Sequence, residues 1–356
     1  MKQQYIKNLE QILQQRFPWH KARVKFLTLI ILSLLKSCTV NLSRLSVKFQ
    51  NDSKIDSNYK RIQRFLNYFA FSYDFIASFI ISLLPKGLKY IITLDRTNWK
   101  FGKQDINILM LAIIYKDMSI PLFWELLPKR GNSSSEERIE IVEKAIKLLG
   151  KENITSILGD REFVGINWFK YLCKTGIVFR MRIKSNTCID SHKTKGKYVA
   201  KIFRALPLNK ELVLPKGVII YKQTLYLSGM RLKDDYLIIA SNLKPKEAII
   251  DYKKRWTIEK LFSHLKTKGF NFEDTHLTDS LKIKKIIAVI TIAFVWSYLV
   301  GVWIDNQTPI KLKKHGRLAI SYFKCGLNYL VHIIENIHFK HNLIEFNSLL
   351  KFLSCT

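Results

Sequence analysis

Two aspartates in this sequence each close an apolar run and are each followed by an arginine. Asp95 ends the run YIITLD (90–95), and Asp160 ends the run ITSILGD (154–160). Both runs are typical of buried strands, and α/β folds place their sites at the carboxyl edge of the sheet. A lone aspartate there is more often a turn former or a helix cap. Two of them in a strongly basic protein predict a shared site, whose oxygen ligands suit Mg²⁺ or Mn²⁺.

Glu259 is the candidate for a third acid at this site. It lies in a predicted helix over 246–268, where a step of 100° per residue puts Tyr252, Arg255, Glu259 and Lys266 within an arc of roughly 60°. The apolar side chains occupy a separate arc: Ile258, Leu261, Phe262 and Leu265. The simpler interpretation is a solvated face with one i, i+4 ion pair worth roughly 0.3 kcal/mol. Because the two aspartates need a further ligand, we favour the functional interpretation.

The N-terminal segment 1–84 is predicted to be an all-helical DNA-binding domain. It carries 13 basic and 4 acidic residues, and its apolar periodicity indicates short helices with a tight turn between them. The basic side chains of its last strongly periodic helix, near 57–70, are Lys60, Arg61 and Arg64. This combination is typical of helix-turn-helix DNA readers. The alternative is a plain helical bundle with a solvated basic face.

Residues 85–281 are predicted to form the domain that holds the acids. Strand patterns occur at 90–95, 106–115, 119–127, 154–160 and 177–183, and helical patterns at 135–149 and 164–175. This order indicates a mixed α/β sheet. Short β-like runs between 184 and about 245, including 200–204, indicate a β-rich insertion. The remaining segment, 282–356, indicates a helical C-terminal region that is a natural place for a dimer interface.

Composition narrows the class of partner. The 356 residues carry 59 Lys and Arg against 28 Asp and Glu, a formal net charge of +31, which favours polyanionic partners. The five cysteines include no CxxC pair, which argues against a disulfide framework or a Cys-type zinc site and fits a reducing, cytoplasmic setting.

The apolar run 286–303 just reaches the length of a membrane span. We expect a buried core helix there and no membrane partner, with a single span as the alternative.

Three motifs in this sequence resemble those of the IS4 family of DDE transposases. Tyr252-x2-Arg255-x3-Glu259-x6-Lys266 is similar to the family's Y-R-E-K signature at every spacing. The blocks LDRTNW (94–99) and GDREF (159–163) are similar to those around the family's first and second aspartates. The resemblance covers roughly residues 20–300 and includes the long β-rich gap before the glutamate.

The resemblance implies an RNase H-like fold in which Asp95, Asp160 and Glu259 form a catalytic triad that binds two divalent ions, Mg²⁺ or Mn²⁺. It implies that Tyr252, Arg255 and Lys266 hold phosphates of double-stranded DNA at the transposon end. Trp256 follows the arginine as in close relatives and is a further DNA-binding candidate. The resemblance also implies a bacterial, cytoplasmic and nucleoid-associated enzyme that binds terminal inverted repeats as a homodimer. Such an enzyme cleaves at the repeats and joins the 3′-OH to target DNA through a hairpin intermediate.

Two alternatives to an active transposase remain open on the sequence. The first is an RNase H-like DNA nuclease that cuts without strand transfer, and the second is an inactive DNA-binding relic. Cleavage by water and joining by a 3′-OH are the same in-line displacement, so the three acids suit both kinds of enzyme. The presence of all three acids argues against a relic.

Overall fold

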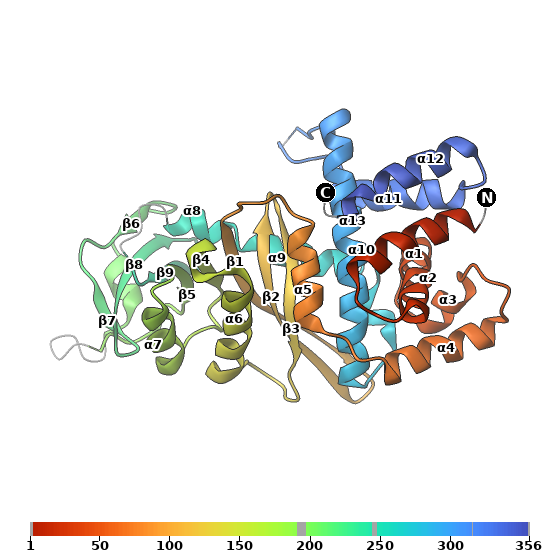
Figure 1. Ribbon diagram of the computed structural model, residues 1–356. Coiled ribbons are helices and arrows are strands. Elements are labelled where there is room, and N and C mark those ends of the chain that lie inside the picture. Colours follow the sequence, from red (N-terminus) through yellow and green to blue (C-terminus); the bar gives the residue numbers. More distant parts are fainter. Residues whose placement is uncertain (1–2, 191–196, 244–247, 315, 355–356) are drawn as a thin grey trace. The chain divides into compact units, whose positions relative to one another are not determined.

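The computed structural model describes residues 3–190, 197–243, 248–314 and 316–354 (Figure 1). The chain divides into two compact units. The helical unit comprises Met1–Lys86, Phe101–Gln104 and Phe262–Thr356. The sheet unit comprises Gly87–Lys100 and Asp105–Leu261.

The sheet unit is built on one mixed β-sheet. Among the described residues its nine strands run in the order β3-β2-β1-β4-β5-β9-β8-β6, with β7 paired to β8. The strands are β1 (Tyr90–Phe101), β2 (Gln104–Tyr115), β3 (Met118–Leu126), β4 (Ile154–Gly159), β5 (Phe179–Ile183), β6 (Glu211–Val213), β7 (Val218–Ile220), β8 (Gln223–Arg231) and β9 (Tyr236–Ser241). Strands β1, β4 and β5 are parallel, whereas β3 and β9 are antiparallel to β2 and β5 respectively. The order of the first five strands confirms the predicted RNase H-like mixed sheet.

The register of β1 against β4 places two acids side by side. The last parallel pair is Leu94↔Gly159, so Asp95 and Asp160 are the next residues on two adjacent strands. The prediction that Asp95 ends its strand was wrong, because β1 continues to Phe101. Strand β4, however, stops at Gly159, so beyond this pair β1 continues without its parallel partner. Asp95 therefore still lies at the carboxyl end of the parallel pairing.

Helices cover both faces of the sheet (Figure 1). Helix α6 (Ser135–Leu149) begins with a capping box formed by Ser134 and Glu137, and α7 (Ile166–Thr175) packs beside it. Phe179 of β5 contacts Phe169 of α7, while the next residue, Arg180, pairs with an acid of α8 (Ala248–Lys253). Because successive side chains of a strand point to opposite faces, α7 and α8 lie on opposite sides of the sheet.

The β-rich insertion extends the sheet rather than forming a separate fold. Strands β8 and β6 continue it beyond β9, and β7 pairs with β8. The expectation of a strand at 200–204 was wrong, because Val199–Phe203 is a 3-10 helix, η3. Val199 and Phe203 are both fully buried while Lys201 between them is exposed, whereas a strand would place all three on one face. A second short 3-10 helix, η1 (Lys151–Asn153), leads into β4.

The predicted single helix over 246–268 is two helices. Helix α8 ends at Lys253 and α9 (Trp256–Leu265) begins after a turn at Lys254–Arg255. The backbone N–H of Lys254 donates to Asp251 and that of Arg255 to Tyr252, both across three residues instead of four. These 3-10-type bonds tighten the chain. The expectation that Tyr252 and Glu259 share one helix face was therefore wrong, although both still serve the same site.

The helical unit combines the N-terminal and C-terminal segments. Its N-terminal helices are α1 (Gln4–Arg16), α2 (Lys21–Ser37), α3 (Leu42–Val47), α4 (Ile55–Tyr68) and α5 (Tyr73–Ser82). The C-terminal ones are η4 (Phe272–Thr275), α10 (Ser280–Gln307), α11 (Tyr322–Glu335), α12 (Lys340–Leu349) and α13 (Lys351–Ser354). Helix α10 packs against α2, α4, α5 and α11. Two glycines allow α10 and α11 to approach closely. A Cβ at Gly301 would collide with the backbone of Tyr322, and a Cβ at Gly326 would collide with that of Ser297.

Helix α10 is long and apolar enough to cross a membrane. In the described part of the chain it is one such helix, and the bent pair α4–α5 would count as a second if taken as one span. In the structure 94% of the apolar window of α10 is buried inside the protein. This burial is the behaviour predicted for a core helix at 286–303.

Candidate active site

Asp95 and Asp160 are held in similar ways at the carboxyl end of β1 and β4. The backbone N–H of Arg96 donates to Asp95 Oδ1 at 2.7 Å, and that of Arg161 donates to Asp160 Oδ1 at 2.7 Å. Each carboxylate thus has one oxygen anchored by the main chain. The other oxygen of each group remains for a second partner, so the strand ends present acceptors of fixed orientation.

Helix α9 positions the third acid, Glu259. The Thr257 and Ser119 hydroxyls form a buried hydrogen bond of 2.7 Å, which ties the first turn of α9 to β3. Ile258 and Leu261 are fully buried, so the apolar side of this turn faces the core, as predicted. Glu259 lies between these anchors and keeps 36% of its side chain exposed. It is therefore fixed at its base and open at its carboxylate.

Arg255 joins two of the acids. Its Nη1 donates to Asp95 Oδ2 at 2.8 Å and its Nη2 donates to Glu259 Oε1 at 2.6 Å. The arginine side chain is 8% exposed and that of Asp95 15% exposed. Burial alone would lower the pKa of Arg255, but the adjacent Tyr252, the acids and the bond to Glu259 outweigh it and raise that pKa. A permanently charged guanidinium therefore bridges two acids that are 164 positions apart in the chain.

Tyr252 connects the same cluster to Asp160. Its hydroxyl donates to Asp160 Oδ1 at 3.3 Å, and the guanidinium of Arg255 lies 5.6 Å from the centre of its ring. The ring packs with Ile239, Ala248 and Ile249, so α8 is fixed on the sheet at this point. Burial raises the pKa of Tyr252, which keeps the hydroxyl protonated and able to donate.

The environment of Asp95 disfavours its charge. Burial raises the pKa of Asp95 to about 6, and the nearby Asp160 and Glu162 carboxylates add to the rise. Arg255 and the backbone N–H of Arg96 oppose it. Because burial disfavours the ionised form of Asp95, an additional positive charge beside it would stabilise that form strongly. Carboxylates with such a shifted pKa are common at functional sites.

The donor set fits hard divalent cations, although the acids as they stand do not form a cation site. In the described residues, no three His, Cys, Asp or Glu side chains are arranged to hold a metal ion. The reason at this site is visible in the contacts, since Arg255 stands between Asp95 and Glu259. The donors are carboxylate oxygens throughout, with Asp160 at the matching position of the next strand, and such sets suit Mg²⁺ or Mn²⁺.

A supporting network around the acids was not anticipated from the sequence. Arg96 forms a bidentate pair with Glu162 at 2.8 and 2.9 Å and donates to Asn107 at 2.7 Å. The buried Arg138 of α6 donates to the backbone carbonyls of Glu162 and Val164. These bonds fix the turn that follows Asp160. The available signal was the arginine after each aspartate, but Arg161 pairs elsewhere, with Asp235 at 3.8 Å.

The other predicted DNA-binding residues lie at separate places. Trp256, at the start of α9, is 60% exposed. Lys266 follows the end of α9, belongs to the helical unit and pairs with Glu273 at 2.7 Å. On α4, Lys60 and Arg64 are exposed. Arg61 is half-buried, with its guanidinium 5.0 Å from the ring centre of Phe26.

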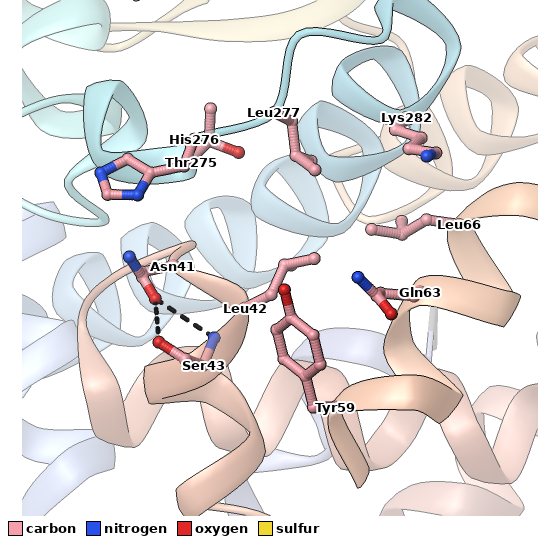
Figure 2. Close-up of a pocket in the computed structure, with 10 residues that line it drawn as sticks. All are labelled: Asn41, Leu42, Ser43, Tyr59, Gln63, Leu66, Thr275, His276, Leu277 and Lys282. Carbon is pink, nitrogen blue, oxygen red and sulfur yellow. Dashed lines mark hydrogen bonds between the residues drawn. The ribbon is translucent and has the colours of Figure 1, made fainter. Parts of the chain in front are cut away.

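The helical unit also contains a pocket of about 260 Å³ between α3, α4 and the segment that leads into α10. Figure 2 shows Tyr59 and Gln63 of α4 on one side and Thr275, His276 and Leu277 on the other. The remaining lining residues are Asn41, Leu42, Ser43, Leu66 and Lys282. The side-chain oxygen of Asn41 caps α3 by accepting from the backbone N–H groups of Ser43 and Arg44, so this oxygen is already engaged. The pocket adjoins the basic helix α4.

Known proteins are similar to this chain in sequence or in structure. The sequence profile of one protein family, described as the transposase DDE domain, matches residues 86–296, more than half of the chain. No curated protein matches the sequence. Among solved structures, the chain is similar to a piggyBac transposase in a synaptic complex with hairpin DNA (TM-score 0.45, 12% identity, covering 97% of this chain and 81% of that one). It is also similar to endonuclease V from Bacillus subtilis (TM-score 0.25, 12% identity, covering 57% and 82%).

Proposed function

Because this chain belongs to the family of proteins that share the transposase DDE domain, we propose that it is the transposase of a bacterial insertion sequence. In this proposal it acts in the cytoplasm on nucleoid DNA. It binds the inverted repeats at the element's ends, cleaves there, and joins the freed 3′-OH to target DNA. Within the family we assign it to the IS4 group, because the spacing of Tyr252, Arg255, Glu259 and Lys266 is that of its Y-R-E-K signature.

One observation carries the proposal. Three acids that are far apart in the chain, Asp95, Asp160 and Glu259, are connected through Arg255 and Tyr252. A merely structural ion pair would need one acid for this arginine. A third acid, linked to the same cluster through a tyrosine, gives more carboxylates than the arginine needs, and carboxylates are ligands of hard cations. The net charge of +31 and the arginine suit phosphates.

The residues divide the chemical work in the following way. Asp95, Asp160 and Glu259 would hold the divalent cations, which when bound make an attacking oxygen more acidic and stabilise a leaving one. Arg255 can bind a phosphate through two parallel N–H groups, and Tyr252 through its hydroxyl. No covalent link between protein and DNA is needed, so Tyr252 positions a phosphate and does not attack it. The exposed Trp256 offers a face on which a base can stack.

The helical unit supplies the remaining DNA contacts in this proposal. Lys60 and Arg64 are exposed on α4, the helix that packs against α3 and lines the pocket of Figure 2 through Tyr59 and Gln63. We propose that α3 and α4 read the inverted repeat, with these two cations on its phosphates. We further propose that two copies pair the two ends of the element, and that cleavage proceeds through a DNA hairpin.

A cleavage and joining assay tests the proposal. The purified chain is incubated with Mg²⁺ or Mn²⁺ and linear DNA that contains the coding sequence with its flanking segments, together with a supercoiled target plasmid. Excised element, hairpin ends and joined plasmid are the expected products. Cleavage without joined plasmid would favour the nuclease alternative. Binding without any cleavage, under conditions in which the protein is folded, would favour the relic.

A further inference from the structure

The guanidinium of Arg255 is engaged by two acids of the site. One of its terminal nitrogens donates to Asp95 at 2.8 Å and the other to Glu259 at 2.6 Å. The side chain is only 8% exposed. An end-on bidentate phosphate contact would use these same two nitrogens, and the third donor, Nε, is buried. Arg255 therefore cannot keep this bridge and also hold a phosphate with the same pair of N–H groups.

The bridge also occupies the acids. Asp95 has one oxygen on the backbone N–H of Arg96 and the other on Arg255, and Glu259 uses Oε1 on Arg255. A divalent cation at these carboxylates would lie beside a buried guanidinium of the same sign. Repulsion between such charges is strong where water is excluded. The cation and Arg255 are thus competitors for the same two acids.

We propose that Arg255 is a positioning residue that takes the place of the cations in the DNA-free protein and transfers to a DNA phosphate when the transposon end binds. This inference rests on the proposed function. In the DNA-free state Arg255 holds Asp95 and Glu259 together against their mutual repulsion. When a phosphate draws the guanidinium away, two carboxylates lose their counter-charge at once. DNA binding and cation binding are therefore cooperative, and each tightens the other by the same factor.

Arg255→Gln separates this proposal from a purely phosphate-binding role for the arginine. The variant keeps a hydrogen-bonding side chain and loses the charge. Mn²⁺ binding to the full-length, DNA-free chain is measured by the electron paramagnetic resonance signal of free Mn²⁺. We expect Arg255→Gln to bind Mn²⁺ at least tenfold more tightly than the natural chain. An arginine that only binds phosphate predicts no gain, and an equal or weaker affinity of the variant overturns the proposal.

Lys254→Gln is the matched control. Lys254 is the neighbouring cation in the same turn, is exposed, and pairs with Asp251 instead of the candidate triad. The Lys254→Gln variant also removes one positive charge from the chain, so it measures the general electrostatic effect on Mn²⁺ affinity. We expect less than a twofold change in Mn²⁺ affinity. A gain equal to that of Arg255→Gln would show that net charge, and not the bridge, limits cation binding.

Thermal unfolding provides a second readout that needs no DNA. Without metal, Arg255→Gln should melt below the natural chain, because Asp95 and Glu259 then face each other unneutralised. Saturating Mn²⁺ should raise the melting temperature of the variant more than that of the natural chain. If Arg255→Gln does not fold, Arg255→Lys retains one charge without the fork and should show an intermediate gain in Mn²⁺ affinity. No gain in a folded Arg255→Lys would contradict the bridge.

Asp160→Asn and Glu259→Gln distinguish failure of this proposal from failure of the proposed function. Both variants should lose Mn²⁺ binding if these acids form the cation site. If both bind Mn²⁺ like the natural chain, the cation site itself is elsewhere and the proposed function fails with it. If both lose binding while Arg255→Gln gains none, the site stands and only the role given to Arg255 is wrong.

Discussion

Leu94 and Gly159 form the last pair of the parallel register between β1 and β4. The next residue on each strand is an aspartate, so Asp95 and Asp160 lie at equivalent positions of adjacent strands, about 4.8 Å apart in the hydrogen-bonding direction. A slip of one residue in this pairing would send the two side chains to opposite faces of the sheet. The site therefore depends on this register.

The raised pKa of Asp95 predicts a pH-dependent stability. Burial raises the pKa to about 6, whereas the group titrates near 3.8 when unfolded. Between these values the folded chain binds more protons than the unfolded one, so the contribution of Asp95 to stability is present below about pH 4 and is lost as the pH rises through about 6. The loss is about 2–3 kcal/mol. Urea unfolding of the metal-free chain and of Asp95→Asn at pH 4, 5 and 6.5 should give a stability difference that changes by this amount, and parallel curves would refute it.

The same pKa predicts an acid limb in the cleavage rate. Cation binding requires ionised Asp95, so the rate at a fixed, subsaturating Mg²⁺ concentration should fall as the pH drops through about 6. Raising the Mg²⁺ concentration should move the limb to lower pH, because the cation competes with the proton. A limb that does not move with Mg²⁺ would assign the titration to another group.

The ion pair between Lys266 and Glu273 predicts that Glu273 restrains DNA binding. If Lys266 holds a phosphate, it must first leave Glu273, to which it is bonded at 2.7 Å. Glu273→Gln should therefore tighten binding to duplex DNA of the element's end by about 2- to 5-fold, the size of an exposed charge pair. Lys266→Ala should weaken DNA binding. When Glu273→Gln is added to Lys266→Ala, the DNA affinity should not rise further. Fluorescence anisotropy with labelled DNA measures all three, and an equal gain in both backgrounds would exclude Lys266.

The basic residues of α4 are predicted to differ in role. Lys60→Ala and Arg64→Ala should each reduce the slope of log affinity against log salt concentration by about 1, because each loses one phosphate contact. Arg61 stacks on Phe26, so Arg61→Ala should instead cost about 1 kcal/mol of stability and leave the salt slope nearly unchanged. Unchanged slopes for Lys60→Ala and Arg64→Ala would remove α4 from the DNA interface.

The close contact of α10 with α11 predicts a large penalty for one added methyl group. A Cβ at Gly301 would collide with the backbone of Tyr322, which cannot move without displacing α11. Gly301→Ala should lower the free energy of unfolding by about 2–3 kcal/mol or more. Gly102→Ala is the control, since it has open space around it and costs only about 1 kcal/mol through its φ of +58°. Equal losses in urea unfolding would show that packing at Gly301 is not tight.

The parts of the fold that were predictable are those that local sequence determines. The capping box of Ser134 and Glu137 starts α6 at the predicted residue, and the apolar runs before Asp95 and Asp160 identify the two strands of the site. The mixed α/β sheet was predictable because parallel strands need crossover connections, and helical patterns at 135–149 and 164–175 lie between the strand patterns. Residue spacing also indicated the acids that the structure connects.

The parts that were not predictable depend on contacts across the chain. The break between α8 and α9 accompanies the burial of Arg255 against Asp95, a partner 160 residues away. Helical periodicity depends on local sequence, so it could not predict this break. Likewise, a glycine at position 301 is unfavourable for a helix when only the sequence is considered. Its role becomes clear from the backbone of α11, which packs directly against it. The pairing of Arg96 with Glu162 needs both strand ends in place, so only the folded sheet reveals it.

The central claim is that Asp95, Asp160 and Glu259 act together on DNA, and cleavage by charge-neutral variants tests it most directly. The natural chain, Asp95→Asn, Asp160→Asn, Glu259→Gln and the control Glu125→Gln, an acid of the same sheet unit paired with Lys144, are each incubated with Mg²⁺ and DNA carrying the element's ends. We predict that the three site variants lose at least 10³-fold of the cleavage rate while they bind DNA within threefold of the natural chain, and that Glu125→Gln cleaves normally. Cleavage near the natural rate by any one of the three folded site variants would contradict the account.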